Sequence, residues 1–490
     1  MTRVAIAAPN EQAAAAAQAI VEAGGNAVDA AIAASVVAMV NEVGIVSLSS
    51  GGFVTMLSAE HHDAVTIDGW MDMPGREPHE NDSTGTWDIW TEYGGGVDVT
   101  IGPGSVATHG AIAALGQAHE RAGQLPWSEL FAPAIEAARR GIQLGAASRF
   151  YLDYVHDSIF GWDEASRAAV HDADGRVTLD RIHLAGLAET LERIAANGPA
   201  EMHTGETARA IARDVQNRGG LLSLVDLSAY QPVVRPALPI DVGDWALGTN
   251  PPPAVGGAVV AAMISLMGDH GLDDPAHIIS VQRKVLAQRL DVFDHSDDLE
   301  RDVAEFLALV KEKDLAMLES GSTAHVSAVD ELGNACSVTI SSGYGSGMIA
   351  RDTGIWLNNC LGEQELNPLG LHGAPPGTRL LSNMAPTVGR RNDGATLAIG
   401  SPGADRITTA VSQVLAGLIN DDLTLQAAVD HPRIHVHRAN RADEVIKRET
   451  DLTMYYGGVG AVMLHPDGQL EAAADPRREG AVRVVAQGAR

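Results

Sequence analysis

Cysteine is almost absent from this chain of 490 residues, which contains only Cys336 and Cys360. Two thiols cannot build a framework of several disulfides, and their spacing is not that of a zinc-binding motif. Aromatic residues are also scarce, at 4% of the chain. The composition therefore does not indicate a surface that stacks nucleobases or sugar rings.

A long uninterrupted apolar run is missing as well. The apolar stretch 27–46 contains Asp29, Asn41 and Glu42, so it should not span a bilayer. The first residues lack the basic segment, apolar core and small-residue cleavage site of a secretory signal. We therefore expect a cytoplasmic protein with no membrane partner.

Positive charge is in short supply. The chain has 34 Lys and Arg against 63 Asp and Glu, a formal net charge of −29. Such a charge repels polyanions, so we expect no nucleic-acid partner. The acidic residues are scattered and form no long blocks, which is typical of a soluble surface.

What is present is enough apolar sequence, 45% of the residues, to bury a large core. The pattern predicts a strand at residues 4–7 and then a helix to Glu22 that Asn10 could cap. A second Ala-rich helix is expected to end near Val43, and a Ser- and Gly-rich turn leads to a buried strand at 53–57. The middle of the chain, about 103–318, is predicted to be mainly helical.

The pattern changes after Ser322. Residues 323–329 and 335–341 alternate around a polar turn that contains Gly333, which predicts a β-hairpin. Further predicted elements are strands at 354–357, 386–388 and 396–399 and a helix at 407–419. Helices before this point and strands after it predict an α+β sandwich built from both halves.

The hairpin carries the motif Thr323-Ala324-His325-Val326-Ser327, followed by Val329-Asp330 and Gly333-Asn334-Ala335. With these residues the chain resembles the γ-glutamyltransferase (γ-glutamyl transpeptidase) family of N-terminal-nucleophile hydrolases. Matching segments in the same order are 24–31, the Gly-rich turn before Phe53, 102–106, 125–127, 132–135, 219–221, 226–227, 251–253, 354–359 and 400–403.

The resemblance implies a four-layer αββα fold. It also implies a precursor that cleaves itself between Ser322 and Thr323 into a large subunit, 1–322, and a small subunit, 323–490. The two pieces would stay together as one intertwined globular unit, with a dimer of such heterodimers as a further possibility.

The chemistry explains why a threonine is needed at the new terminus. A hydroxyl is a weak nucleophile that requires a base. Once Thr323 is N-terminal, its own α-amine can serve, because that group titrates near pH 8. Before cleavage the nitrogen is an amide and accepts no proton, so the precursor should be inactive. The plain alternative is that Thr323 is only the first residue of a strand.

Other catalytic parts follow from the same resemblance. The family stabilises the oxyanion with backbone N–H groups of a Gly-Gly pair, and the matching residues are Gly403 and Ala404. A plain turn after a strand is the alternative there. The family also places a hydroxyl beside the nucleophile, and Ser341 matches it by position, with Ser342 as the alternative.

The substrate clamp departs from the family pattern. The family holds the α-carboxylate with an arginine, where this chain has Trp70, which cannot form a bidentate ion pair. Arg76 lies near in sequence and could substitute. The positions that hold the carboxylate and ammonium otherwise correspond to Ser341-Ser342, Cys360, Glu363 and the pair Ser382-Asn383.

We therefore expect a self-processing amide hydrolase or acyltransferase for a small acyl-amide other than glutathione, without metal or cofactor. Family relatives that cleave short amides such as oxamate fit this expectation. The alternatives are a γ-glutamyl enzyme with a clamp rebuilt around Arg76 and Glu363, an enzyme of C–C bond cleavage in antibiotic biosynthesis, and a non-catalytic binding protein.

Overall fold

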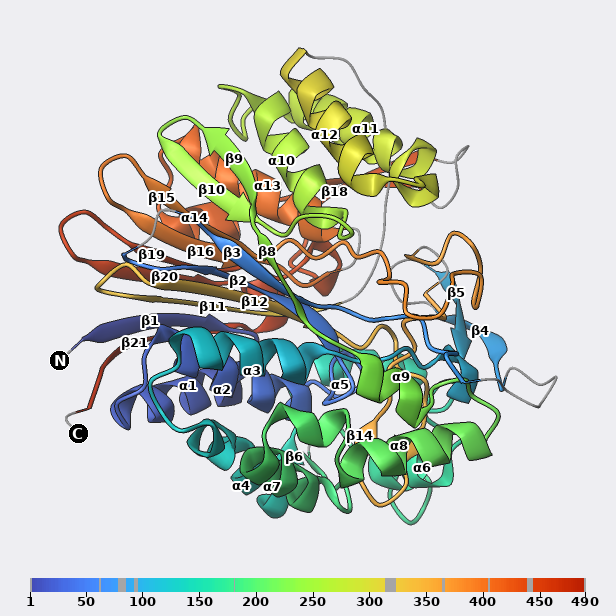
Figure 1. Cartoon of the computed structure of the whole chain (residues 1–490). Coiled ribbons are helices and arrows are strands. Elements are labelled where there is room, and N and C mark those ends of the chain that lie inside the picture. The colour runs from blue at the N-terminus through green and yellow to red at the C-terminus, as the bar shows by residue number, and fades with distance from the viewer. Residues whose placement is uncertain are drawn as a thin grey trace.

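Two antiparallel sheets lie face to face at the centre of the computed structural model, which describes residues 2–60, 63–77, 85–91, 96–179, 181–312, 323–363, 366–403, 406–438 and 444–488 (Figure 1). The first sheet has the order β21-β1-β11-β12-β2-β3-β8 and the second β20-β19-β16-β15-β10-β9. The strands of the first sheet are β1 (Arg3–Ala8), β2 (Gly51–Leu57), β3 (Val65–Gly69), β8 (Val233–Pro236), β11 (Ala324–Asp330), β12 (Ala335–Ser341) and β21 (Ala481–Ala486). Those of the second are β9 (Leu238–Val242), β10 (Trp245–Thr249), β15 (Thr387–Arg391), β16 (Thr396–Gly400), β19 (Gly460–Leu464) and β20 (Leu470–Ala474).

Helices cover the outer face of each sheet. The first sheet is covered by α1 (Glu11–Glu22), α2 (Ala27–Asn41) and α3 (Ala111–Ala122), and the second by α10 (Gly256–Met267) and α13 (Arg406–Ile419), with α11 (Pro275–Asp291) and α12 (Leu299–Glu312) packed on α10 (Figure 1). The four layers are thus helix, sheet, sheet and helix, which confirms the predicted αββα sandwich. Every residue of β11 and β12 is buried, because these central strands are covered on both faces.

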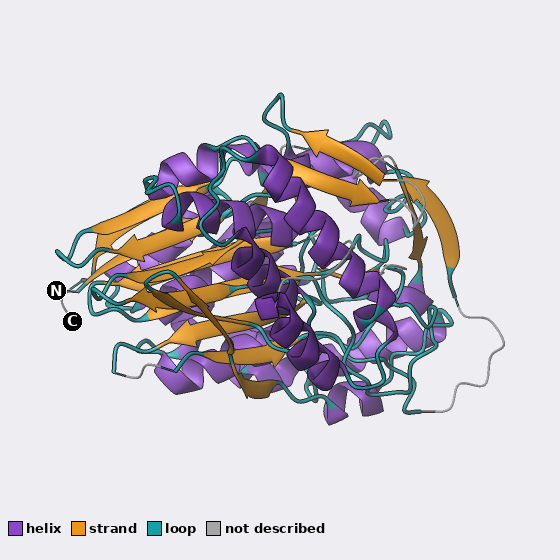
Figure 2. Ribbon diagram, turned by 90° about the horizontal axis from the view of Figure 1, so that it is seen from above, coloured by secondary structure: helices purple, strands orange, loops and turns teal. Residues whose placement is uncertain are grey.

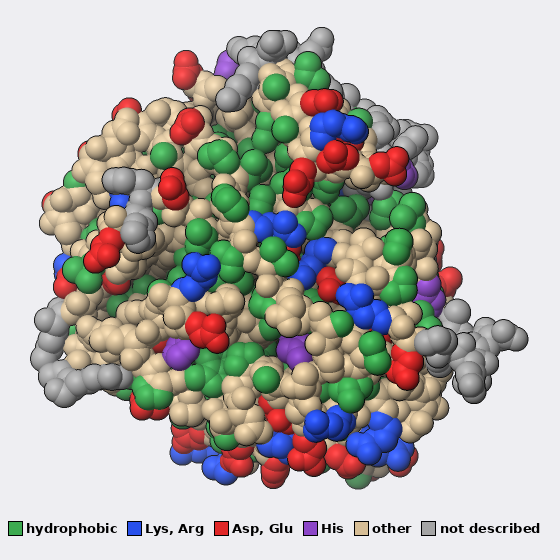
Figure 3. Space-filling model, viewed as in Figure 1, with side chains coloured by type: hydrophobic (Ala, Val, Ile, Leu, Met, Phe, Trp, Pro, Cys, Tyr) green, Lys and Arg blue, Asp and Glu red, His purple; other side chains and the backbone are tan. Residues whose placement is uncertain are grey.

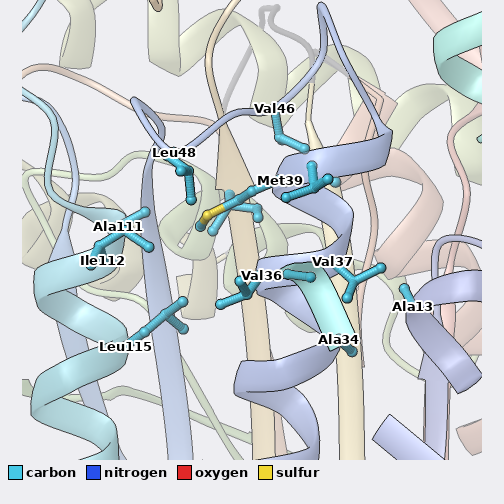
Figure 4. Packing of buried hydrophobic residues seen from close by; sticks show 14 of the residues in the cluster. Ala13, Ala34, Val36, Val37, Met39, Val46, Leu48, Ala111, Ile112 and Leu115 are labelled. Carbon is cyan, nitrogen blue, oxygen red and sulfur yellow. The ribbon is translucent and has the colours of Figure 1, made fainter. Parts of the chain in front are cut away.

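Small side chains let these layers approach closely. Ala5, Ala7 and Ala398 are among the residues packed between the two sheets. In the outer layer every residue of α2 is buried. Figure 4 shows Val36 and Met39 of that helix beside Leu48 and the apolar side of α3.

The rest of the chain forms a helical region below the first sheet and four two-stranded ribbons. The helices of that region are α4 (Ala132–Arg140), α5 (Ala146–Val155), α6 (Glu164–Val170), α7 (Leu187–Asn197), α8 (Glu206–Asn217) and α9 (Leu224–Ala229). The ribbons pair β4 (Trp87–Thr91) with β5 (Val97–Ile101), β6 (Ile142–Gln143) with β7 (Arg181–Ile182), β13 (Ile349–Ala350) with β14 (Ile355–Trp356) and β17 (Ile434–Arg438) with β18 (Glu444–Arg448). The short helix α14 (Leu425–Asp430) follows α13.

Within the described ranges no helix combines the length and hydrophobicity needed to cross a membrane. Figure 3 shows acidic and basic side chains interspersed on one face of the molecule.

Local sequence signals account for the ends of several elements. The Asn10 side chain accepts a hydrogen bond from the Ala13 N–H at 2.9 Å, which confirms the predicted cap of α1. The β11–β12 hairpin is also confirmed. Its turn is held by Asp330, whose Oδ1 accepts from the N–H groups of Leu332 and Asn334.

The expectation of a mainly helical middle is wrong for residues 233–249, which form β8, β9 and β10. The chain leaves β8, an edge strand of the first sheet, and enters β9, an edge strand of the second. Pro236 and Pro239 interrupt the alternating pattern here. Edge strands tolerate proline because one row of their backbone groups is not needed for pairing.

Both sheets combine strands from before and after position 322, and in the first sheet these strands alternate. In the first sheet β11 and β12 lie between β1 and β2, and β1 also pairs with β21. In the second sheet β9 and β10 pair with strands that follow position 322. Figure 2 shows the two ends of the chain side by side. Neither half could therefore form either sheet alone.

Candidate active site

Thr323 immediately precedes β11 and is buried, with 2% of its surface exposed. Side chains alternate along a strand, so Thr323 is on the same face as His325 and Ser327. The Ser327 hydroxyl donates to the carbonyl of Gly460 in the second sheet at 3.2 Å. This face of β11 is thus directed at the space between the sheets, and Thr323 stands at its end.

His325 is the imidazole nearest to Thr323 along the chain, and it is poorly suited to act as a base. Its Nδ1 lies 2.8 Å from the Thr339 hydroxyl and its Nε2 lies 2.8 Å from the Ser327 hydroxyl. Burial lowers the pKa of His325 to about 3. The ring is therefore neutral near pH 7, and both of its nitrogens are engaged.

A pocket brings Thr323 together with five of the residues singled out from the sequence. Its lining consists of Trp70, Thr323, Ser341, Glu363, Leu366, Ser382, Asn383, Met384 and Ile407. The apolar members Leu366, Met384 and Ile407 were not predicted, because apolar side chains carry no chemical signature in a sequence. The lining combines hydroxyl, amide and carboxylate groups with apolar walls beside one threonine.

A second pocket also borders Thr323. Its lining includes Glu42, Pro402 and Arg478. Burial raises the pKa of Glu42 to about 7, and its carboxylate accepts hydrogen bonds from the Asn10 side chain and the Ser148 N–H. Sequence reasoning missed Glu42 and Arg478, since they lie 281 and 155 positions from Thr323 along the chain and only the fold brings them near. Thr323 therefore lies where two pockets meet.

The two serines that could lie beside Thr323 have different surroundings. Ser341 ends β12 and lines the first pocket with Thr323, and its Oγ accepts from the Gly343 N–H at 3.0 Å. Ser342 instead bonds the hydroxyls of Ser47 and Ser50, at 3.1 and 2.8 Å. The geometry thus favours Ser341 as the neighbour of Thr323 and gives Ser342 a structural contact.

Replacing Ser341 with alanine is expected to slow turnover about tenfold or more, because it removes the hydroxyl that the family resemblance places beside Thr323. Ser342→Ala should mainly lower stability, by about 1–2 kcal/mol, since it leaves two buried hydroxyls without this partner. Steady-state kinetics and thermal unfolding of both variants separate the roles. A larger loss of turnover in Ser342→Ala than in Ser341→Ala would contradict this assignment.

The loop after β16 carries the candidate oxyanion donors. Gly403 has φ +121°, a conformation that glycine adopts without strain, and its carbonyl accepts from the Arg406 N–H at 3.1 Å. The helix α13 begins at Arg406, and Ile407 of its first turn lines the pocket. A helix N-terminus favours nearby negative charge. Ala404, the other predicted donor, and Ser322, the predicted cleavage position, lie outside the described residues.

Trp70 is the residue that the sequence resemblance matches to a carboxylate-binding arginine of the family. Its ring stacks on Phe53, with centroids 6.1 Å apart, and its Nε1 donates to the Leu381 carbonyl at 2.8 Å. The only polar atom of the indole is therefore already bonded. Among the described lining residues of this pocket none is Lys or Arg.

The structure does not bring Arg76 to this pocket. Arg76 is exposed, and its backbone N–H donates to the Asp226 carboxylate at 2.9 Å. The basic residue behind Trp70 is Arg379, which sequence reasoning missed. Its guanidinium bonds the Trp70 carbonyl at 3.0 Å and the Asp68 carboxylate at 2.9 Å, so it holds the backbone of Trp70 in place.

Glu363 and Cys360 are both buried, but only Glu363 lines the pocket. Burial raises the pKa of the Cys360 thiol well above its usual value, and the neighbouring Glu363 carboxylate adds to this. Cys360 is packed in the hydrophobic core that contains α10 and α13. The structure therefore buries Cys360 in this core, outside the described lining of the pocket.

The chain is similar to known proteins along most of its length. The family profile described as gamma-glutamyltranspeptidase matches residues 13–485. The glutathione hydrolase proenzyme of Pseudomonas aeruginosa is 30% identical over 88% of this chain and 82% of its own length. The Acylase ACY 1 proenzyme of Pseudomonas sp. (strain V22) is 26% identical over 96% of this chain and 91% of its own length.

The fold has a solved counterpart as well. The crystal structure of cephalosporin acylase from Bacillus halodurans superposes with a TM-score of 0.79 at 21% identity, covering 98% of this chain and 96% of that one. The profile match spans nearly the whole chain, from before α2 to the last strand. The chain therefore belongs to the gamma-glutamyltranspeptidase family, within the N-terminal-nucleophile hydrolases.

Proposed function

We propose that this chain is a self-processing amide hydrolase or acyltransferase that forms its acyl-enzyme on Thr323. Membership of the family and the proenzyme relatives support an acyl-transfer hydrolase. The observation that carries the threonine assignment is the position of Thr323, buried at the start of β11 and bordering two pockets.

Maturation would begin with attack of the Thr323 hydroxyl on the Ser322 carbonyl. The peptide C–N bond breaks, the acyl group moves to oxygen as an ester, and the nitrogen becomes a free amine. Water then hydrolyses the ester, leaving a carboxylate on Ser322 and an N-terminal Thr323. The strands that interleave across position 322 support two fragments that remain associated. Association of two such heterodimers is part of the same proposal.

Turnover would use the new amine as the base. It accepts the proton of the Thr323 hydroxyl as that oxygen attacks the amide carbonyl of the substrate. The backbone N–H groups at Gly403 and Ala404 would stabilise the oxyanion. The substrate amine leaves with the proton, and water or an acceptor amine then releases the acyl group. His325 is neutral and both of its ring nitrogens are hydrogen-bonded, which supports the amine and not His325 as the base.

The pocket supports an acyl group other than γ-glutamyl. Trp70 takes the place of the expected arginine, its N–H is bonded to the protein, and Arg76 lies elsewhere. The described lining residues thus supply no cation for an α-carboxylate, whereas Glu363 adds a carboxylate of its own. The alternative of a clamp rebuilt around Arg76 is not favoured by this geometry.

Four p-nitroanilides with similar acyl chains test this substrate class: pentanoyl, glutaramoyl, glutaryl and γ-glutamyl. We expect the mature protein to hydrolyse the γ-glutamyl compound at least about tenfold more slowly than the best of the other three, because an unpaired carboxylate is costly to bury. Absorbance of released nitroaniline gives kcat/KM for each. A preference for the γ-glutamyl compound over all three would overturn the proposed specificity.

A further inference from the structure

Arg289 is a buried cation next to the acyl pocket, and the mechanism above does not use it. It lies in the last turn of α11 and is 2% exposed. A buried guanidinium is costly unless its N–H groups are bonded. Its Nη1 donates to the side-chain oxygen of Asn383. The helix α11 packs on the outside of α10, so this contact joins the outer layer to the pocket (Figure 1).

Asn383 itself is held firmly. The carbonyl of the preceding residue, Ser382, accepts from the N–H groups of Val255 and Gly256 at 2.8 and 3.0 Å, where α10 begins. The Ser382 hydroxyl accepts from the Met384 N–H at 3.2 Å. The backbone of this segment is therefore fixed against α10. The orientation of the Asn383 side-chain amide is determined separately, by its own contacts.

Arg289 sets that orientation. A guanidinium has donors and no acceptor, so only the Oδ1 atom of Asn383 can face it. The Nδ2 atom then points the other way. Within the described part of the chain this nitrogen is buried and has no hydrogen-bond partner, while Asn383 lines the pocket beside Thr323. A buried N–H group without a partner has lost its hydrogen bond to water, and a ligand oxygen would offset that loss.

We propose that Arg289 is a positioning residue that turns the Asn383 Nδ2–H donor toward the acyl pocket, where it recognises an acceptor oxygen on the acyl group. The acceptor lies away from the scissile amide and is a carbonyl, carboxamide or carboxylate oxygen. Glu363 lines the pocket directly, whereas the Arg289 cation lies behind Asn383 and outside the described lining, so a neutral acceptor is favoured over a carboxylate. This inference rests on the proposed acyl-transfer function and narrows its substrate class.

The test compares kcat/KM for glutaramoyl and pentanoyl p-nitroanilide, which differ by the terminal acceptor. We expect the wild-type protein to prefer the glutaramoyl compound about tenfold, the effect of about one good hydrogen bond. Arg289→Met should reduce this preference to about threefold or less, mainly by raising KM for the glutaramoyl compound. Arg289→Lys, which keeps a donor, should retain most of it.

Two further variants make the result decisive. Asn383→Asp keeps an oxygen for Arg289 and replaces the Nδ2 donor by an acceptor, so it should abolish the preference. Arg283→Met removes another arginine of α11, one that pairs with Glu444 on the surface, and should leave the preference at the wild-type value. Gel electrophoresis of each variant checks maturation. If Arg289→Met does not fold, Arg289→Lys and Asn383→Asp still decide the outcome.

Several results would overturn the inference. They are a wild-type protein without preference for an acceptor, an Asn383→Asp variant that keeps the preference, and an Arg289→Met variant that matches Arg283→Met. Failure of the underlying function has a different signature, because maturation and turnover would then survive in Thr323→Ala. The glutaryl compound, which ends in a carboxylate, is compared with the glutaramoyl compound, which ends in a neutral carboxamide. If the glutaryl compound is hydrolysed faster, the preference for a neutral oxygen is contradicted.

Discussion

Thr323→Ala is expected to yield a single chain of 490 residues that neither matures nor hydrolyses amides. The variant lacks the oxygen that we propose attacks the Ser322 carbonyl, so no α-amine should be released and no acyl-enzyme should form. Loss of a nucleophile of this kind lowers kcat by a factor on the order of 10⁴ or more. Denaturing electrophoresis should show one band, whereas we expect the wild-type protein to give fragments of 322 and 168 residues, the two parts of the 490-residue chain.

Thr323→Ser is the matched control for this variant. It keeps a hydroxyl at the same position and loses only the methyl group, so both fragments should appear, although more slowly. N-terminal sequencing of its small fragment should begin Ser-Ala-His-Val. If Thr323→Ala still matures, or if it hydrolyses the preferred anilide at the wild-type rate, the nucleophile lies elsewhere.

Gly403→Ala is expected to lower turnover about 10²- to 10³-fold, the effect of losing one oxyanion donor. Gly403 has φ +121°, and a Cβ atom there would lie 2.7 Å from the Gly457 Cα. The backbone at Gly403 must therefore shift, and its N–H group moves with it. Steady-state kinetics with the best anilide measures the loss, and the rate of fragment formation shows whether maturation depends on the same donors.

Gly394→Ala provides the control, because it places the same strain at the other end of β16. Gly394 has φ +98° and has no atom within 4 Å of an added Cβ. This variant should lose about 1 kcal/mol of stability and retain its turnover. Equal kinetic losses in the two variants would mean that the Gly403 effect is general destabilisation and not a loss of oxyanion stabilisation.

Local sequence patterns were sufficient for the elements whose signals lie within a few residues. The Asn10 cap and the hairpin turn around Asp330 are examples, and the structure contains both. The strands around Pro236 and Pro239 were missed because proline conceals the alternation of an edge strand. The stacking of two sheets depends on contacts between distant segments, and it was predicted only through the family resemblance.

The candidate site shows the same division. Trp70, Glu363 and Asn383 could be singled out because they occupy positions that match a family motif. Arg289 and Arg379 could not, since their importance depends on hydrogen bonds to residues 94 and 309 positions away. Single positions in a sequence do not encode such long-range partners, and only the packed structure reveals them.

The pairing of β1 also determines how much of the chain must be synthesised before the first sheet can be completed. One neighbour of β1 is β21, and Arg3 pairs with Ala486. The first strand to be synthesised must therefore wait for nearly the last before its sheet is complete. Folding of this kind is post-translational and is slow, because the loop that it closes spans almost the entire polypeptide. A chain that stalls before residue 481 would lack β21, and we expect it to remain uncut.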